Sequence, residues 1–149
     1  LKEFDWAESF IHEWNGKLPK EVRDKLLHYN LAKLAYAKGD TYTALDELRF
    51  VRSRDTLFIL SSDVFRAKIY YEQEEFDLLD AHLDKMQVFL RRNQGGYHHR
   101  HYLNFVLFCR KLTALAKHQR VELATLQAAI EHEPEVNERG WLLSRVMKK

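Results

Sequence analysis

Apolar positions recur every three or four residues along almost the whole chain, which is the spacing of one face of an α-helix. The first run, residues 4–14, stops at Asn15-Gly16; the second begins at Pro19 and stops near Gly39. Proline fits the first turn of a helix, and glycine tolerates the left-handed conformation that often ends one. The pattern therefore predicts two helices, the second closed by a left-handed cap at Gly39.

Six further helical runs follow, separated by short loops. They are expected at residues 41–51, 57–71, 76–91, 97–117, 121–132 and after Pro134, with Asn137 as the cap of the last helix. Short loops make each helix pack against its sequence neighbour. We therefore expect an all-α chain of about seven or eight antiparallel helices.

One pattern occurs twice, at an offset of 35 residues. The first copy has Ala32 on one helix, Gly39-Asp40 at the turn, and Ala44 and Leu48 on the next helix. The second copy has Ala67, Glu74-Glu75, and Leu79 and Leu83 at the matching positions. Two helices can cross closely only where a side chain is small, so the alanines mark predicted crossings. This pattern resembles the tetratricopeptide repeat (TPR).

The resemblance implies an antiparallel helix-pair solenoid, a TPR-like α-α superhelix forming a single domain. Its segments are residues 1–16 (the second helix of a preceding repeat), 19–53, 56–92, 97–133 (a degenerate repeat) and the terminal helix 137–147. Because the chain opens halfway through a repeat and lacks an initial Met, we expect it to be part of a longer protein. Residues 29–34, 68–72, 88–93 and 102–105 also resemble the C-terminal region of large TPR-type proteins of Bacteroidetes bacteria. That family carries no activity that could be transferred.

Composition narrows the class of protein. Apolar residues make up 46% and charged residues 31% of the chain, which excludes wholesale disorder. No apolar run approaches the roughly 18 residues of a membrane span, and the start is not a signal peptide, so we expect a cytoplasmic protein. Phosphate-binding loops, nucleophile elbows and zinc-protease motifs are absent from the sequence. We therefore expect no enzyme, no cofactor and no catalytic residue.

In TPR proteins, ligands lie in a concave groove lined by the first helix of each pair. Transferring that register predicts a partner-binding groove lined by Tyr29, Lys33, Tyr36, Lys68 and Tyr71. Tyrosine rings supply rigid contact area, and lysines attract carboxylates. The leading interpretation is thus a scaffold that binds a protein or peptide.

Charge suggests an alternative. Residues 1–84 carry 12 basic and 17 acidic residues, whereas residues 85–121 carry eight basic residues and no acid. A basic patch there would comprise Arg91, Arg92, Arg100, Arg110 and Lys111, interleaved with the aromatic residues Tyr97 and Tyr102. Such a segment can bind phosphates and stack bases, so the alternative function is a nucleic-acid or phosphate-binding module. The helical spacing of Tyr102, Phe105 and Phe108 instead predicts core positions, which weighs against a nucleic-acid partner.

Three smaller features remain. His98 and His101 share a helical face with His99 beside them, but no carboxylate or cysteine lies nearby in sequence, so we expect no metal. Cys109 has no partner for a disulfide and is expected to be a small buried apolar residue. Finally, exposed apolar side chains at Phe4, Trp6, Phe10 and Trp14 would indicate that the partner is the rest of its own chain, because an internal repeat lacks a polar cap.

Overall fold

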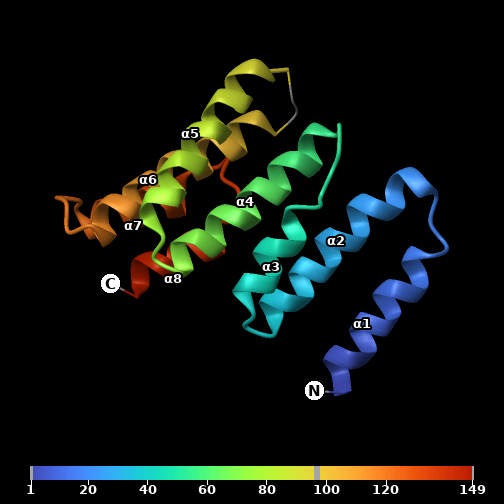
Figure 1. The fold of residues 1–149 in the computed structure, drawn as a ribbon. Helices are drawn as coiled ribbons and strands as arrows, with labels where there is room; N and C mark the ends of the chain where they lie inside the picture. The colour runs from blue at the N-terminus through green and yellow to red at the C-terminus, as the bar shows by residue number, and fades with distance from the viewer. Residues whose placement is uncertain (1, 96–97, 149) are drawn as a thin grey trace. The chain divides into compact units, whose positions relative to one another are not determined.

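In a computed structural model, which describes residues 2–95 and 98–148, the chain forms eight α-helices and no strand within those residues (Figure 1). The helices are α1 (Lys2–Asn15), α2 (Lys20–Ala37), α3 (Thr41–Leu48), α4 (Thr56–Glu72), α5 (Phe76–Arg92), α6 (His99–Ala116), α7 (Leu123–His132) and α8 (Arg139–Met147). The prediction of an all-α chain is confirmed. No described helix combines the length and apolar character needed to cross a membrane.

The chain divides into two compact units, residues 1–69 and residues 70–149, called here the N-terminal and C-terminal units. The boundary falls inside α4. In the N-terminal unit α2 packs against both α1 and α3. In the C-terminal unit α6 packs against α5, α7 and α8, and α7 packs against α8.

Each unit has its own core of buried side chains. The buried cluster of the N-terminal unit consists of Ala32, Ala35, Ala44, Leu48 and Ile69. Fully buried residues of the C-terminal unit include Leu79, Leu83, Met86, Leu90, Phe105, Val106, Cys109, Leu112, Ile130 and Leu142. The predicted core positions Tyr102, Phe105 and Phe108 are all buried, which confirms that prediction.

The two turns at the predicted 35-residue offset have the same backbone conformation. Gly39 and Glu74 both have a positive φ, 82° and 59°. After α2, the N–H groups of residues 39 and 40 donate to the carbonyls of residues 36 and 35. After α4, the N–H groups of residues 74 and 75 donate to the carbonyls of residues 71 and 70. At each turn the pair of hydrogen bonds forms a Schellman motif. The predicted left-handed cap at Gly39 is confirmed.

Helix α3 begins at a side-chain cap and ends earlier than the apolar pattern predicts. The Asp40 carboxylate accepts hydrogen bonds from Thr43 N (3.0 Å) and Thr43 Oγ1 (2.5 Å), and these bonds lower the pKa of Asp40. The helix stops at Leu48 rather than Val51, because the N–H groups of residues 49–51 donate to carbonyls three residues back. Val51 nevertheless packs against the core, which explains its apolar character.

The predicted cap of the last helix is wrong. Helix α8 begins after Glu138, whose φ is 61°, and Asn137 instead donates its N–H to the carbonyl of His101 at 3.2 Å. Arg139 secures the preceding turn by donating to the carbonyls of Ile130 and Glu133. The turn between α7 and α8 therefore depends on contacts distant in sequence, which local capping rules do not reveal.

Replacing Glu74 by glycine is expected to raise the free energy of unfolding by up to about 1 kcal/mol. A non-glycine residue in the left-handed conformation costs about 1–2 kcal/mol, offset in part by the greater unfolded-state entropy of glycine. Urea denaturation followed by circular dichroism measures the change. Glu75→Gly is the matched control: its φ is −85°, so glycine there should lower stability. Equal effects of the two variants would contradict the prediction.

Candidate functional site

Three of the five predicted groove residues come together on α2, beside two phenylalanines of α4. We call this surface of the N-terminal unit the aromatic–lysine strip. It comprises Lys25, Tyr29, Lys33, Tyr36, Phe58 and Phe65. All four aromatic residues are partly buried, whereas Lys33 is exposed.

The rings of the strip form a continuous row. The centroid of Tyr29 lies 5.0 Å from that of Phe58 and 6.2 Å from that of Phe65, and Tyr36 lies 5.3 Å from Phe65. These are the tilted and edge-to-face arrangements that aromatic rings favour. The sequence register identified the tyrosines but not Phe58 and Phe65, because their place beside α2 depends on how α4 packs.

Two lysines lie over this row. The Nζ atom of Lys33 is 4.9 Å from the Tyr29 ring centroid, and that of Lys25 is 4.8 Å from the Phe58 centroid. Both distances fall within the roughly 6 Å range of cation–π attraction. Within the described residues, neither ammonium group forms an ion pair with a carboxylate. The strip therefore presents positive charge above aromatic surface.

The other two predicted groove residues have different surroundings. Lys68 lies on α4, about one turn beyond Phe65, and is partly exposed. Tyr71 does not line an open surface: only 7% of it is exposed, and its ring packs against Phe76 and Trp141 in the C-terminal unit, with centroids 5.7 and 5.5 Å away. Including Tyr71 in the groove was wrong, because α8 covers this turn of α4.

Tyr71 lines a pocket of about 170 Å³ in the C-terminal unit that is open to solvent. Burial raises the pKa of Tyr71, and its hydroxyl has no hydrogen-bond partner among the residues that the structure describes. Beside it, Glu72 accepts a hydrogen bond from Trp141 Nε1 at 3.0 Å and lies 3.3 Å from Arg145 Nη2. These contacts attach α8 to the end of α4.

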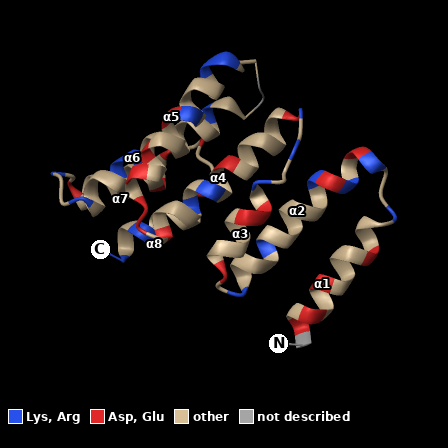
Figure 2. Cartoon of the chain, in the orientation of Figure 1, with Lys and Arg blue, Asp and Glu red and all other residues tan. Residues whose placement is uncertain are grey.

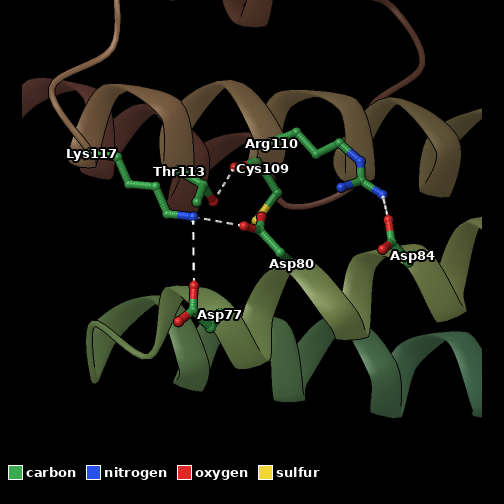
Figure 3. Close-up of polar contacts among 7 residues, drawn as sticks. All are labelled: Asp77, Asp80, Asp84, Cys109, Arg110, Thr113 and Lys117. Carbon is green, nitrogen blue, oxygen red and sulfur yellow. Dashed lines mark hydrogen bonds and ion pairs between the residues drawn. The ribbon is translucent and has the colours of Figure 1, made fainter.

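The basic segment is not a free cationic face, because α5 supplies carboxylates to it (Figure 3). Arg110 Nη2 lies 2.5 Å from Asp84 Oδ1, and Lys117 Nζ lies 2.8 Å from Asp80 Oδ2 and 3.9 Å from Asp77 Oδ1. The hydrogen bond to Asp80 raises the pKa of Lys117. Charge counted along the sequence missed these pairs, since their members are 26 to 40 residues apart.

The remaining members of the predicted basic patch are exposed. Arg91 and Arg92 end α5, where cations complement the helix dipole, and Arg100 lies in the first turn of α6. Lys111 is also exposed, with its Nζ 5.8 Å from the Phe108 ring. Figure 2 shows basic positions on both α5 and α6 and acidic positions on α5. Tyr97, the aromatic residue expected to open this segment, lies outside the described residues.

The three histidine side chains do not face one common site. The rings of His98 and His101 contact edge to face with centroids 5.4 Å apart, whereas His99 Nε2 lies 2.9 Å from the carbonyl oxygen of Leu90. No group of three or more metal-ligating side chains is found in the described parts of the chain. The geometry thus gives His99 a structural contact with α5.

Cys109 is fully buried in α6, as the apolar run around it predicted. Burial raises the pKa of its thiol to about 12. Because the thiolate is the reactive form, the folded chain should hold Cys109 inert.

We expect Cys109 in the native chain to react with Ellman's reagent at pH 8 at least about 100-fold more slowly than in denaturant, because both burial and the raised pKa suppress the thiolate. Absorbance of the released thiolate measures the rate. The matched control is Ser9→Cys in a Cys109→Ala background, which places a thiol at an exposed position of α1. Similar native rates at the two positions would contradict the prediction.

No protein-family model, curated protein or solved structure matches this chain.

Proposed function

We propose that the chain is a TPR-like scaffold that binds a carboxylate-bearing segment of another protein along the aromatic–lysine strip. The observation that carries this proposal is the row of partly exposed rings beneath two lysines without carboxylate partners among the described residues. Rings provide contact area at low entropic cost, and the lysines provide the attraction for acidic residues. No catalytic role is proposed.

The repeat architecture is supported by local features that recur at the 35-residue offset. The matched turns share the Schellman motif, and the paired positions Ala32 and Ala67, Ala44 and Leu79, and Leu48 and Leu83 are all buried. Asp77 and Asp80 pair with Lys117 while Asp84 pairs with Arg110, so the pairs run in opposite order along α5 and α6. These features favour antiparallel packing of neighbouring helices, the arrangement expected within each pair of a TPR-like repeat.

A peptide array tests the proposal directly. We expect fluorescently labelled peptides that combine acidic and apolar residues to bind the full chain, and their lysine-substituted counterparts not to bind. The double variant Lys25→Glu/Lys33→Glu should weaken binding about tenfold or more. Lys111→Glu is the matched control, since Lys111 is also an exposed lysine over a ring but lies in the C-terminal unit. The proposal fails if the double variant binds as tightly as the wild type.

The alternative function is nucleic-acid binding by residues 85–121. The ion pairs of Arg110 and Lys117 weigh against it, because they occupy two of the cations that would contact phosphates. It predicts a salt-dependent mobility shift of generic RNA or DNA. We expect no such shift even at low salt, where phosphate contacts are strongest. A shift abolished by Arg91→Ala/Arg92→Ala would favour the alternative over the scaffold.

A further inference from the structure

The outer face of α1 carries three large aromatic side chains that are open to solvent. Trp6 is 66% exposed, Phe10 43% and Trp14 51%. They are four residues apart, and their rings contact in sequence, with centroid distances of 5.1 Å from Trp6 to Phe10 and 5.7 Å from Phe10 to Trp14. Phe4, the other large apolar residue of this segment, is instead partly buried, with Lys38 Nζ 5.8 Å from its ring centroid. A continuous exposed aromatic row of this kind marks an interaction surface.

Opposite charges stand at the two ends of this row. Glu3 lies seven residues before Phe10 and Lys17 lies seven residues after it. Seven residues are about two helical turns, so Glu3 lies on the same face of α1 as Phe10. Lys17 Nζ is 4.7 Å from the Trp14 ring centroid, which places it on that face as well. Both charged residues are exposed. The row is therefore flanked by a carboxylate at one end and an ammonium group at the other, with equal sequence spacing on either side of Phe10.

We propose that this face binds a second copy of the same chain, with the two α1 helices antiparallel about a two-fold axis at Phe10. Antiparallel pairing brings Trp6 beside Trp14 of the second copy and Phe10 beside its own counterpart. It also brings Glu3 close to Lys17 of the second copy, twice per dimer. Parallel pairing would instead oppose Glu3 to Glu3 and Lys17 to Lys17.

A second copy fits this surface better than an arbitrary apolar helix. Such a helix could cover the rings but would have no reason to match opposite charges at the two ends of the row. A two-fold interface requires one surface to be complementary to itself, and the residues at positions 3, 6, 10, 14 and 17 meet that requirement. Lys17 also lies 3.6 Å from Glu13 of its own chain, a contact between exposed groups that contributes little.

The size of the interface predicts weak association. Helix α1 has 14 residues and is therefore roughly 21 Å long. A single helix pair of that length buries less than the roughly 1,600 Å² of a standard stable interface. We expect a reversible, concentration-dependent dimer with a Kd of about 1 µM to 1 mM.

Sedimentation equilibrium of the full chain over that concentration range measures the association. Phe10→Ser should weaken the dimer at least about tenfold, because Phe10 lies at its centre. Tyr42→Ser is the matched control: Tyr42 is 84% exposed, on α3, and should leave the Kd unchanged. Phe10→Ser should also leave peptide binding by the aromatic–lysine strip unchanged, since that strip lies on α2 and α4.

A charge exchange tests the antiparallel register. Glu3→Lys and Lys17→Glu should each weaken self-association, because each creates two like-charged contacts. Mixing the two variants should restore it. In the mixed dimer, the lysine introduced at position 3 of one chain meets the glutamate introduced at position 17 of the other, and the unchanged Lys17 meets the unchanged Glu3. Raising the salt concentration should reduce both the weakening caused by each single variant and the recovery seen in the mixture.

A cross-link locates the two-fold axis. In a Cys109→Ala background, Phe10→Cys should form a disulfide-linked dimer under mild oxidation, because the axis passes through that position. Trp6→Cys should not, since its two copies would be about 12 Å apart along the helices.

Four results would overturn the proposal. If the wild-type chain stays monomeric at all concentrations, the aromatic face of α1 does not bind a second copy and would bind another polypeptide instead. A dimer that Phe10→Ser does not weaken uses a different surface. Cross-linking at position 6 but not at position 10, or a failure of the mixed charge variants to reassociate, excludes the antiparallel register.

Discussion

Phe105→Ala is expected to lower the free energy of unfolding by about 3–5 kcal/mol, the largest effect of any single substitution considered. The Phe105 ring is fully buried in α6, and its centroid lies 6.3 Å from that of Trp141. Because α6 packs against α5, α7 and α8, the cavity left by alanine would open at the centre of the C-terminal unit. A loss of this size consumes much of the stability of an ordinary domain.

Tryptophan fluorescence can assign this loss to the C-terminal unit. Trp141 is the one tryptophan of that unit, since the other two of the chain are Trp6 and Trp14. Urea denaturation of a Trp6→Phe/Trp14→Phe background, with and without Phe105→Ala, follows Trp141 alone. Leu107→Ala is the matched control on α6: Leu107 is exposed, so its replacement should change stability by no more than about 0.5 kcal/mol. Comparable effects of the two substitutions would show that α6 is not the central helix of the unit.

Ala32→Leu and Ala67→Leu are each expected to lower the free energy of unfolding by about 1–3 kcal/mol. Both alanines are completely buried and hold matched places 35 residues apart. A leucine at either position would force neighbouring helices apart. Leucine is apolar and a good helix former, so crowding is the only reason to expect a loss of stability. Urea denaturation followed by circular dichroism measures both variants.

Ala37→Leu separates crowding from any general effect of the substitution. Ala37 ends α2 and is exposed, so leucine there has room and should be close to neutral. If the repeat interpretation holds, Ala32→Leu and Ala67→Leu should cost similar amounts. A large cost at one position with none at the other would indicate that the two are not structurally equivalent.

The helices were predictable because their signals are local. Period-3.6 spacing, Pro19 and Gly39 fix where helices begin and end through the backbone conformations that these residues allow. Errors occurred where the deciding contact is distant in sequence. The start of α8 depends on a hydrogen bond from Asn137 to His101, and the loop after α3 keeps Val51 packed against the core without helical geometry.

The candidate site shows the same division. The repeat register grouped Tyr29, Lys33 and Tyr36 on one face of α2, and helical periodicity alone places them there. Phe58 and Phe65 could not be assigned to that group, nor could Tyr71 be removed from it, without the packing of neighbouring helices.

By itself, the sequence determined that the chain is helical, where most helices lie, and that side chains such as Tyr102, Phe105 and Phe108 are buried. The tertiary structure alone decided which charges are paired. Arg110 and Lys117 lie in a segment without acids yet are ion-paired, because helix packing places the carboxylates of α5 beside them. Lys25 and Lys33 lie in the half of the sequence whose net charge is negative, yet their ammonium groups lie over aromatic rings. Electrostatic attraction depends on distance in space, and a linear charge count carries no information about that distance.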